Sequence, residues 1–263
     1  MRFRIFLQVN ESQAERKVIP INYQYYMSAA IYKILNEGNP EFSAWLHSQG
    51  YADGAKQFKL FTFSKLSIPQ RRIDIDSIKI LSREVSFDIS FFPHPAIDGF
   101  ITGIFKRQEL SIGNRDRNVS FVVKSIEKLP TPLFDEKNVY RTLTPVVASL
   151  KKEGSRTATY LNPQDAEFKD IFIRNLIEKL KAWNHNSMQS TTPLKDISTE
   201  FRCISEIKRK GEVIKQGSAE ESKIIGYLFD FVLTAPVEFH EIGYAAGFGE
   251  KNSMGFGLVE KIG

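Results

Sequence analysis

The chain has 263 residues, enough for one large domain or two smaller ones, and 42% of them are hydrophobic, so a packed core is expected. Its net charge of +5 and pI of about 9.1 are compatible with a nucleic-acid partner. The single cysteine, Cys203, excludes a disulfide framework and a cysteine-rich zinc site and fits a cytoplasmic location, and no apolar run approaches the ~20 residues needed to cross a membrane.

The first half of the chain predicts the element order β, α, β, β, α, β. Apolar and polar residues alternate over 2–9, which predicts a strand. Apolar residues three and four apart predict a helix over 23–36, which Gly38 and Pro40 end. This is the ferredoxin-like order with one additional short helix. The further expected elements are a short helix over 41–48, strands over 56–64, 72–81 and 84–92, a helix over 95–106, and strands over 108–113 and 118–127.

The segment 56–72 is basic and holds no acidic residue. Phenylalanines are interleaved with its Lys and Arg residues, a combination that is common where single-stranded nucleic acid binds. A solvated strand face over an ordinary core explains the same pattern. From this segment we take Lys56, Lys65 and Arg71 as candidate RNA contacts.

The second half repeats the element order after a proline-stiffened break at Leu129-Pro130-Thr131-Pro132. We therefore expect an α+β chain of two tandem ferredoxin-like domains, 1–128 and 138–263, joined by a linker over 129–137. The two halves share no obvious sequence period. The hairpin expected between the middle strands of the second half carries three further candidate contacts, Lys208, Arg209 and Lys210. The expected elements are strands over 139–150, 201–208, 219–234 and 256–261 and helices over 162–183 and 237–246, with a polar linker over 184–193.

Five glycines fall between Gly243 and Gly257, just before the last expected strand. Such a density indicates positive φ angles or the close approach of another group. Backbone N–H groups beside Lys251 suit a phosphate. The order helix, loop, strand is the reverse of a Walker loop, and Asn252 stands where a dinucleotide fingerprint would need its third glycine. A long glycine-rich hairpin explains the composition as well.

The stretch GFGEKNSMGFG resembles the C-terminal glycine-rich signature of the CRISPR repeat-processing endoribonucleases of the RAMP superfamily. In that family the loop follows the last helix of a second ferredoxin-like domain and helps to hold the RNA. The resemblance therefore implies RNA contacts within this loop. The residues that it marks are Gly247, Gly249, Lys251, Asn252, Ser253 and Gly255.

A second part of the resemblance lies in the first half. The stretches QYYMSAAIYKIL, WLHSQG and FKLFTFS look like the family's N-terminal Tyr…His…Lys arrangement, which falls here on Tyr32, His47 and Lys59. Lys56 is the nearest competitor of Lys59. Taken alone, His47 is more simply read as a structural residue.

These residue types suit RNA cleavage without a metal ion. The 2′-hydroxyl attacks its own adjacent phosphate while a base takes its proton, an acid protonates the leaving 5′ oxygen and a cation stabilises the phosphorane. Histidine titrates near neutral pH and can serve as either acid or base, whereas tyrosine suits a donor role and lysine the cation. No His-Glu-x-x-His or comparable metal spacing occurs in the sequence. The residues therefore favour chemistry that needs neither metal nor cofactor.

The resemblance implies a metal-independent endoribonuclease of antiviral defence that cleaves CRISPR precursor RNA within its repeats, leaving a 5′-hydroxyl and a 2′,3′-cyclic phosphate. The alternative is a non-catalytic RAMP protein that binds and holds repeat RNA. A nucleotide-binding regulatory domain would instead require the glycine loop to hold a free nucleotide. Beyond the repeat RNA, the implied partners are a CRISPR effector complex and a second copy of the chain.

Overall fold

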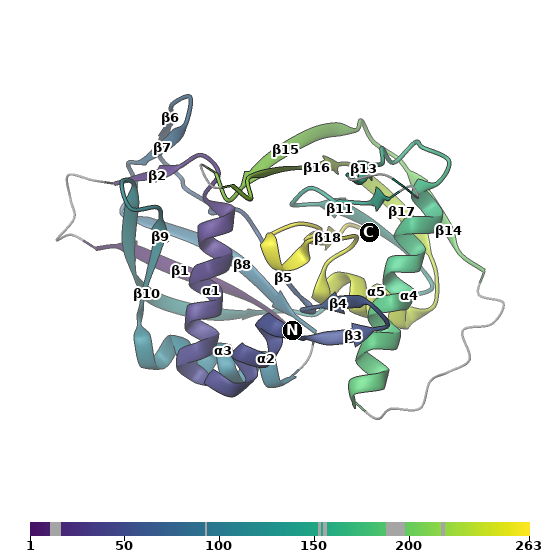
Figure 1. Cartoon of the computed structure of the whole chain (residues 1–263), viewed down its shortest axis with the longest axis horizontal. Coiled ribbons are helices and arrows are strands. Elements are labelled where there is room, and N and C mark those ends of the chain that lie inside the picture. Colours follow the sequence, from purple (N-terminus) through teal and green to yellow (C-terminus); the bar gives the residue numbers. More distant parts are fainter. Residues whose placement is uncertain (11–16, 93, 152–153, 155–156, 188–197, 217–218) are drawn as a thin grey trace.

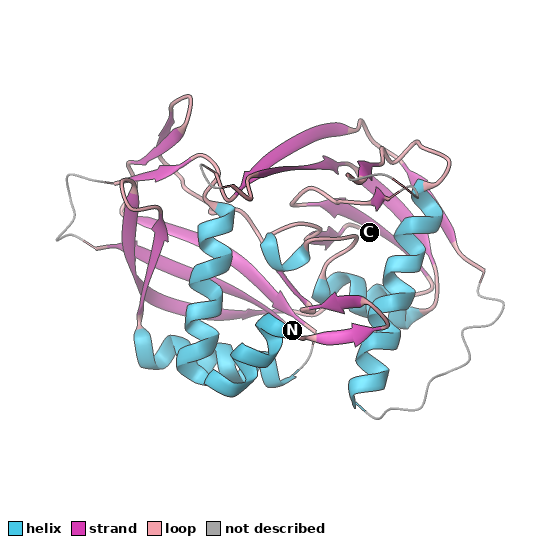
Figure 2. Cartoon of the chain, viewed as in Figure 1, coloured by secondary structure: helices cyan, strands magenta, loops and turns pink. Residues whose placement is uncertain are grey.

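The computed structural model describes residues 1–10, 17–92, 94–151, 154, 157–187, 198–216 and 219–263. The chain forms two units that lie side by side, each built on one antiparallel sheet (Figure 1). Both units combine helices with antiparallel strands (Figure 2). None of the helices in the described residues is long and apolar enough to cross a membrane.

The sheet of the first unit has the strand order β5-β8-β1-β10-β9. Strand β1 lies in the middle and pairs antiparallel with both β8 and β10. This central placing of the first and third strands of a βαββαβ unit is the ferredoxin-like arrangement, and the predicted fold class is confirmed. The strands are β1 (Arg2–Val9), β5 (Phe61–Phe63), β8 (Glu84–Phe91), β9 (Glu109–Gly113) and β10 (Asn118–Leu129), and the helices are α1 (Gln24–Gly38), α2 (Pro40–Ser48) and α3 (His94–Arg107).

Helices α1 and α3 cross with their backbones in direct contact. A Cβ atom added to Gly103 would lie 1.8 Å from the carbonyl oxygen of Ile34, and one added to Gly38 would lie 1.8 Å from the carbonyl oxygen of Gly99. Helix α2 then begins immediately, because Asn39 accepts a 3.0 Å hydrogen bond from the backbone N–H of Phe42. The sharp turn at Asn39 places α2 beside the C-terminal half of α1.

Two of the expected strands of the first unit are wrong in part. The strand predicted over 56–64 is interrupted at Lys59 and Leu60, where Leu60 has a φ of 52° and cannot continue the ladder. The strand predicted over 72–81 is a hairpin instead. The observed elements are β3 (Tyr51–Asp53) paired with β4 (Lys56–Phe58), and β2 (Val18–Pro20), β7 (Ser77–Ile80) and β6 (Arg71–Ile73) in a small sheet of that order.

The second unit has the strand order β14-β17-β11-β18, again with the first and third strands central. A long hairpin, β15–β16, extends beyond this sheet. The strands are β11 (Lys137–Thr142), β12 (Ser149–Leu150), β13 (Thr159–Tyr160), β14 (Glu200–Cys203), β15 (Lys208–Ile214), β16 (Ser222–Leu228), β17 (Asp230–Thr234) and β18 (Val259–Lys261); the helices are α4 (Phe168–Ser187), α5 (Val237–Ala246) and the 3₁₀ turn η2 (Asn252–Met254).

The expected boundaries of the second unit need correction. The strand predicted over 139–150 ends at Thr142, and the two predicted over 201–208 and 219–234 are each divided. The long helix begins at Phe168, because Asn162 instead builds a turn in which its backbone N–H donates to Asp165 at 2.7 Å. That helix continues to Ser187, so the first residues of the predicted polar linker are helical. The rest of that linker lies outside the described residues.

The two units share one continuous buried core. Strand β3 of the first unit packs against α4 of the second, where the rings of Tyr51 and Trp183 lie 5.6 Å apart. Arg2 is buried at the same boundary and donates to the carbonyl oxygens of Val259 at 2.7 Å and Tyr244 at 2.9 Å. The boundary is therefore fixed by apolar packing and by buried hydrogen bonds.

Candidate active site

Tyr32, His47 and Lys59 lie together at the surface of the first unit. Tyr32 is on α1 and His47 on α2, and their rings meet edge to face with centroids 5.3 Å apart. The Nζ atom of Lys59 donates to the backbone carbonyl oxygen of His47 at 3.0 Å. The tight turn at Asn39 and the bond from Ser43 Oγ to the Tyr32 carbonyl oxygen, at 3.3 Å, hold the two helices in this relation.

The three side chains differ in exposure and in proton affinity. The His47 side chain is exposed and, with Tyr32, lines a surface depression of about 540 Å³. Burial raises the pKa of Tyr32 to about 12, although a hydrogen bond with Ser253 opposes part of this rise. Partial burial lowers the pKa of the Lys59 ammonium. The raised pKa favours the protonated phenol at neutral pH, which suits a hydrogen-bond donor better than a base.

Lys56 and Lys59 point to different partners. The Nζ atom of Lys56 lies 2.7 Å from both carboxylate oxygens of Glu178 on α4. The positive φ of Leu60 ends β4 and brings Lys59 to His47 instead. Of these two lysines, the geometry places Lys59 at the candidate site.

The glycine loop, residues 247–257, belongs to the second unit but packs on the first. Ser28 Oγ on α1 donates to the Ser253 carbonyl oxygen at 2.7 Å, and Gln24 Nε2 donates to the Gly255 carbonyl oxygen at 3.1 Å. The loop therefore runs along the same helix that carries Tyr32, and Ser253 reaches the Tyr32 hydroxyl. The candidate site thus draws on both units.

Three glycines of the loop are required by its backbone conformation. Gly247, Gly249 and Gly255 all have positive φ, of 93°, 68° and 86°. The side-chain amide of Asn252 is buried and donates to two carbonyl oxygens of the loop, those of Phe248 at 3.1 Å and Phe256 at 3.0 Å. Asn252 thus closes the loop upon itself, while Lys251 is exposed.

A buried lysine that sequence analysis missed holds the other side of this loop. Lys179 on α4 is 1% exposed, and its Nζ atom donates to the carbonyl oxygens of Gly247 at 2.6 Å and Gly249 at 2.7 Å. Burial lowers the pKa of this ammonium to about 7. Its signal in the sequence is a lysine beside the apolar stripe of α4, three residues after Leu176.

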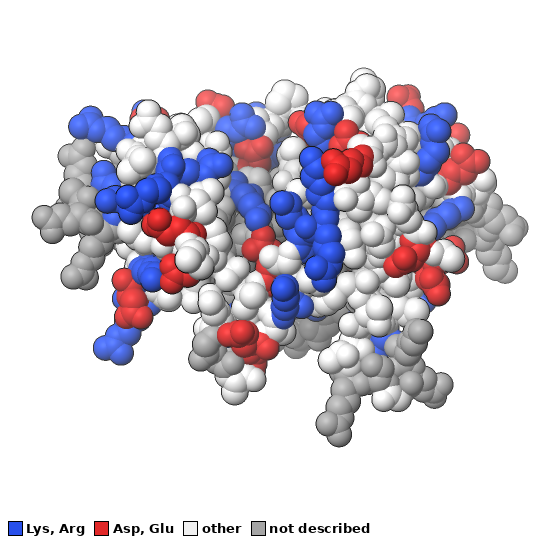
Figure 3. Space-filling model, turned by 90° about the horizontal axis from the view of Figure 1, so that it is seen from above, with Lys and Arg blue, Asp and Glu red and all other residues white. Residues whose placement is uncertain are grey.

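The remaining basic candidates lie on a different part of the surface. Seen from above, Lys and Arg side chains gather over the middle of the molecule, with acidic side chains among them (Figure 3). Lys65 of the first unit forms an ion pair with Glu212 on β15, which joins the two units there. Arg71 donates to the Ile68 carbonyl oxygen at 2.7 Å. The last three candidates, Lys208, Arg209 and Lys210, are exposed on β15.

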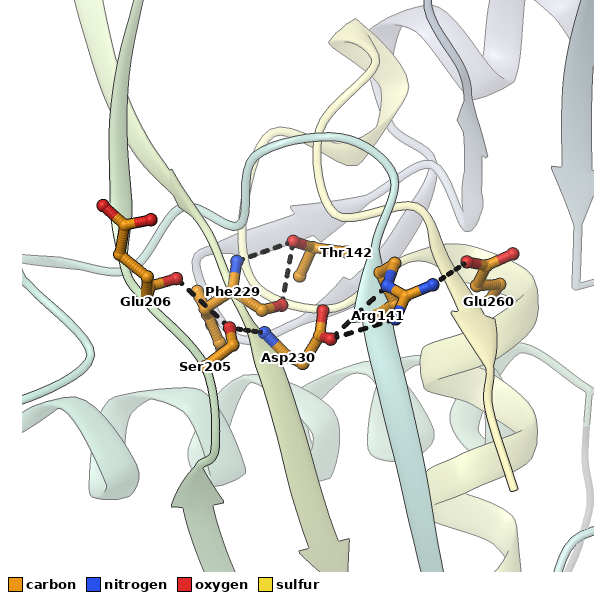
Figure 4. A network of polar contacts seen from close by, with 7 residues as sticks. All are labelled: Arg141, Thr142, Ser205, Glu206, Phe229, Asp230 and Glu260. Carbon is orange, nitrogen blue, oxygen red and sulfur yellow. Dashed lines mark hydrogen bonds and ion pairs between the residues drawn. The ribbon is translucent and has the colours of Figure 1, made fainter.

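The basic hairpin β15–β16 is anchored where it leaves the sheet of the second unit (Figure 4). Thr142 Oγ1 accepts from the Phe229 N–H at 2.8 Å and donates to the Phe229 carbonyl oxygen at 3.0 Å. Ser205 Oγ accepts from the Asp230 N–H at 2.7 Å, and Arg141 forms ion pairs with the Asp230 carboxylate on one side and with Glu260 on the other. These bonds fix the junction between β16 and β17 and so the direction of the hairpin.

Within the described residues, no three His, Cys, Asp or Glu side chains lie close enough together to hold a metal ion. His240 is buried and bonded to Tyr140 and to the Glu136 carbonyl oxygen. His185 is exposed near the end of α4. His47 is therefore the histidine that the structure places beside Tyr32.

Comparisons with known proteins give concordant matches over the whole chain. The family model for the N-terminal part of CRISPR-associated protein Cas6 matches residues 18–127, and the model for its C-terminal part matches residues 127–261. The CRISPR-associated endoribonuclease Cas6 1 of Methanocaldococcus jannaschii is 28% identical over 100% of this chain and 93% of its own length. A putative CRISPR-associated endoribonuclease-like protein Cas6 of Pyrococcus furiosus is 31% identical over 94% of each.

Solved structures agree with these matches. A Cas6-related protein of Pyrococcus furiosus superposes with a TM-score of 0.78 at 29% identity, over 100% of this chain and 98% of the other. A protein described as a RAMP protein binding different RNA substrates also gives a TM-score of 0.78, at 26% identity, over 100% of both chains.

Proposed function

Because the chain belongs to the Cas6 family of CRISPR-associated proteins, we propose that it is an endoribonuclease that cuts CRISPR precursor RNA within its repeats to make guide RNAs. The observation that carries this proposal is that Tyr32 and His47 line one surface depression, with Lys59 bonded to the His47 backbone and Ser253 of the glycine loop bonded to Tyr32. Relatives of this chain are named CRISPR-associated endoribonucleases. Family membership supports the substrate, and the three side chains support the chemistry.

The proposed reaction needs no metal ion. The 2′-oxygen forms a bond to the adjacent phosphorus and gives up its proton, and the bond from phosphorus to the 5′ oxygen breaks as that oxygen gains a proton. The products are a 2′,3′-cyclic phosphate and a 5′-hydroxyl. His47, exposed to substrate, transfers one of these protons as general acid or general base.

Tyr32 and Lys59 assist this transfer. The Tyr32 hydroxyl keeps its proton at neutral pH and donates a hydrogen bond to the reacting group. The Lys59 ammonium, held beside His47, stabilises the negative charge that develops on the phosphorane oxygens. The attraction between the ammonium and the developing negative charge is stronger where water is partly excluded, which fits the partial burial of Lys59.

The RNA is proposed to run from the glycine loop, through Lys251 and Ser253, to the basic segment that includes Lys65 and Arg71. The hairpin residues Lys208, Arg209 and Lys210 would contact further phosphates. Such contacts release counterions, so affinity should fall steeply with salt. A CRISPR effector complex, a second copy of the chain and a cytoplasmic location remain predictions of the family resemblance.

The test is cleavage of a 5′-labelled repeat RNA in EDTA under single-turnover conditions. The parent protein should cut, and His47→Ala should be slower by about 10²–10⁴-fold, the range for a lost proton-transfer group. His185→Ala, which removes another exposed histidine, should cut at the parental rate. RNA with a 2′-deoxy sugar at the mapped position should stay intact. Cleavage of the deoxy substrate, or a parental rate for His47→Ala, would refute the mechanism.

The same experiment tests the alternative of a non-catalytic RNA-holding protein. One of the relatives is named only endoribonuclease-like, and a similar structure is described by its RNA binding. Tight binding of repeat RNA without any cutting would assign this chain to that role.

A further inference from the structure

A cavity of about 640 Å³ lies between the two units, next to the candidate active site. Its walls come from β4 and the two residues after it, from the segment that begins with β12, from α4 and from the glycine loop. It shares Lys59 with the candidate site, and its lining includes Ser253, which is bonded to Tyr32. Whatever occupies this cavity would therefore lie beside the reacting phosphate.

Asn175 of α4 lines this cavity and carries an unused hydrogen-bond acceptor. The residue is 7% exposed, and its Oδ1 atom is buried without a hydrogen-bond partner in the described part of the chain. A buried polar oxygen without a partner is costly, and native proteins rarely keep one without a reason. A ligand that brings an N–H group into the cavity would satisfy it.

The other groups of the cavity suit the rest of a nucleotide. Phe58, Ile171 and Met254 give it apolar walls. Arg174 and Lys251 are exposed at its edge, and no carboxylate pairs with either of them among the described residues. The carboxylates that also line it are engaged: Glu178 pairs with Lys56, and Glu250 accepts two bonds from Ser149. The cavity thus combines apolar walls and two cations without a carboxylate partner among the described residues with one hydrogen-bond acceptor, Asn175 Oδ1, that has no donor.

We propose that this cavity binds the base of one nucleotide of the RNA, close to the cut phosphate, and that Asn175 reads that base. The proposal rests on the proposed function. The Oδ1 atom accepts an N–H of the base edge, the ring lies between the apolar side chains, and Arg174 and Lys251 contact the neighbouring phosphates. Single-stranded RNA is commonly read in this way, through bases that leave the stack and enter protein pockets.

The test combines a protein variant with a scan of the RNA. Asn175→Leu keeps the volume of the side chain and removes the acceptor, and Asn186→Leu, an exposed asparagine of the same helix, is the matched control. Each variant and the parent are given repeat RNAs that lack one base at a time, and binding and single-turnover cleavage in EDTA are measured. The parent should bind and cleave RNA that lacks the base at one position near the cut about tenfold less well than intact RNA, as expected for the loss of one hydrogen bond to a base edge.

Asn175→Leu should bind and cleave intact RNA about tenfold less well than the parent does. Removal of the base at that one position should then cause no further loss in this variant. Its thermal midpoint should equal or exceed that of the parent, because the orphaned oxygen is gone. Asn186→Leu should behave as the parent does. The proposal would be overturned if, at every position, the loss of binding and cleavage caused by Asn175→Leu added to the loss caused by the missing base.

Three further outcomes separate the causes of failure. If Asn175→Leu does not fold, Arg174→Ala, a change at an exposed side chain, should weaken RNA binding and lower the salt slope by about one phosphate contact; an unchanged slope counts against the cavity. Binding of free AMP, GMP, CMP or UMP without any position-specific loss would assign the cavity to a mononucleotide and overturn its role in RNA reading. A parent that neither binds nor cuts repeat RNA would overturn the proposed function, whereas a parent that cuts with additive losses overturns the cavity alone.

Discussion

Replacing Lys179 by Met tests whether this buried ammonium positions the glycine loop. The variant keeps the length of the side chain but leaves the Gly247 and Gly249 carbonyl oxygens without their donor. Each buried carbonyl left unpaired costs about 1–3 kcal/mol. Against this, the variant no longer has to bury an ammonium, so the net change in stability depends on pH.

The direction of that dependence follows from the pKa of Lys179, which burial lowers from its ordinary value of 10.5 to about 7 in the folded protein. Between these values the unfolded chain binds more protons than the folded protein, so the contribution of Lys179 to stability rises with pH and is flat below about pH 7. One pH unit contributes at most about 1.4 kcal/mol of stability, so the rise from pH 7 to pH 9 is about 2–3 kcal/mol at most. The hydrogen bonds to the two carbonyl oxygens favour the charged ammonium and make this rise smaller, so we expect about 1–2 kcal/mol.

The assay is urea unfolding of the parent, Lys179→Met and Lys181→Met at pH 7, 8 and 9. Lys181 lies on the same helix but is exposed, so its variant should follow the parent at each pH. Lys179→Met should fall further below the parent as the pH rises, and it should bind repeat RNA less tightly because the loop has lost its support. Parallel stability profiles for the parent and Lys179→Met would refute the reasoning.

The remaining predictions concern the candidate site and the helix crossing. Lys59→Ala should slow single-turnover cleavage by about 10²-fold, as loss of a charge-stabilising donor does. Lys56→Ala, which removes the exposed lysine of an ion pair, should cut within about threefold of the parent; equal losses would mean that the geometry does not distinguish the two lysines. Tyr32→Phe should lower the cleavage rate but leave the shape of the pH–rate profile between about pH 5 and pH 9 unchanged, because burial keeps the pKa of Tyr32 near 12. An apparent pKa of the profile that shifts near neutral pH would contradict this reasoning. In chemical denaturation, Gly103→Ala should lower the unfolding free energy by about 3 kcal/mol or prevent folding, because its Cβ would meet a backbone oxygen at 1.8 Å. Gly99→Ala on the same helix should be neutral or stabilising, because the nearest contact of its Cβ would be at 3.7 Å.

The helices were the most predictable part of the fold, because their apolar spacing is a local signal. The helix predicted over 23–36 is observed at Gln24–Gly38, and the last helix occurs as predicted, Val237–Ala246. Strands were less predictable where the backbone turns at residues that carry no turn signal. Leu60 takes a positive φ although a leucine disfavours it, since its side chain is 2% exposed and tertiary packing holds it there.

The candidate site was predictable only as a set of residue types. The resemblance indicated Tyr32, His47 and Lys59, but no spacing in the sequence distinguishes Lys59 from Lys56, because the choice depends on the turn at Leu60 and on Glu178 of the other unit. Asn175 and Lys179 were missed for a related reason. The two residues lie four positions apart beside the apolar stripe of α4, where a polar residue is ordinarily solvated. The long-range packing that buries them, for Lys179 the glycine loop, leaves no signal at their own positions.

The glycine loop connects the fold to the chemistry. Gly247 and Gly257 leave no room for a Cβ atom beside the buried amide of Asn252, and Gly249 lies against the Val147 carbonyl oxygen, so the dense glycine pattern is explained first by packing and only then by contact with a phosphate. The same loop presents Ser253 to the Tyr32 hydroxyl. Tyr32 and His47 belong to the first unit, yet the group that orients Tyr32 comes from the second. We therefore expect the site to be complete only when the two units are docked. Gln24 and Ser28, which bond the glycine loop to α1, and Lys179, which bonds it to α4, should then act on the reaction through the loop.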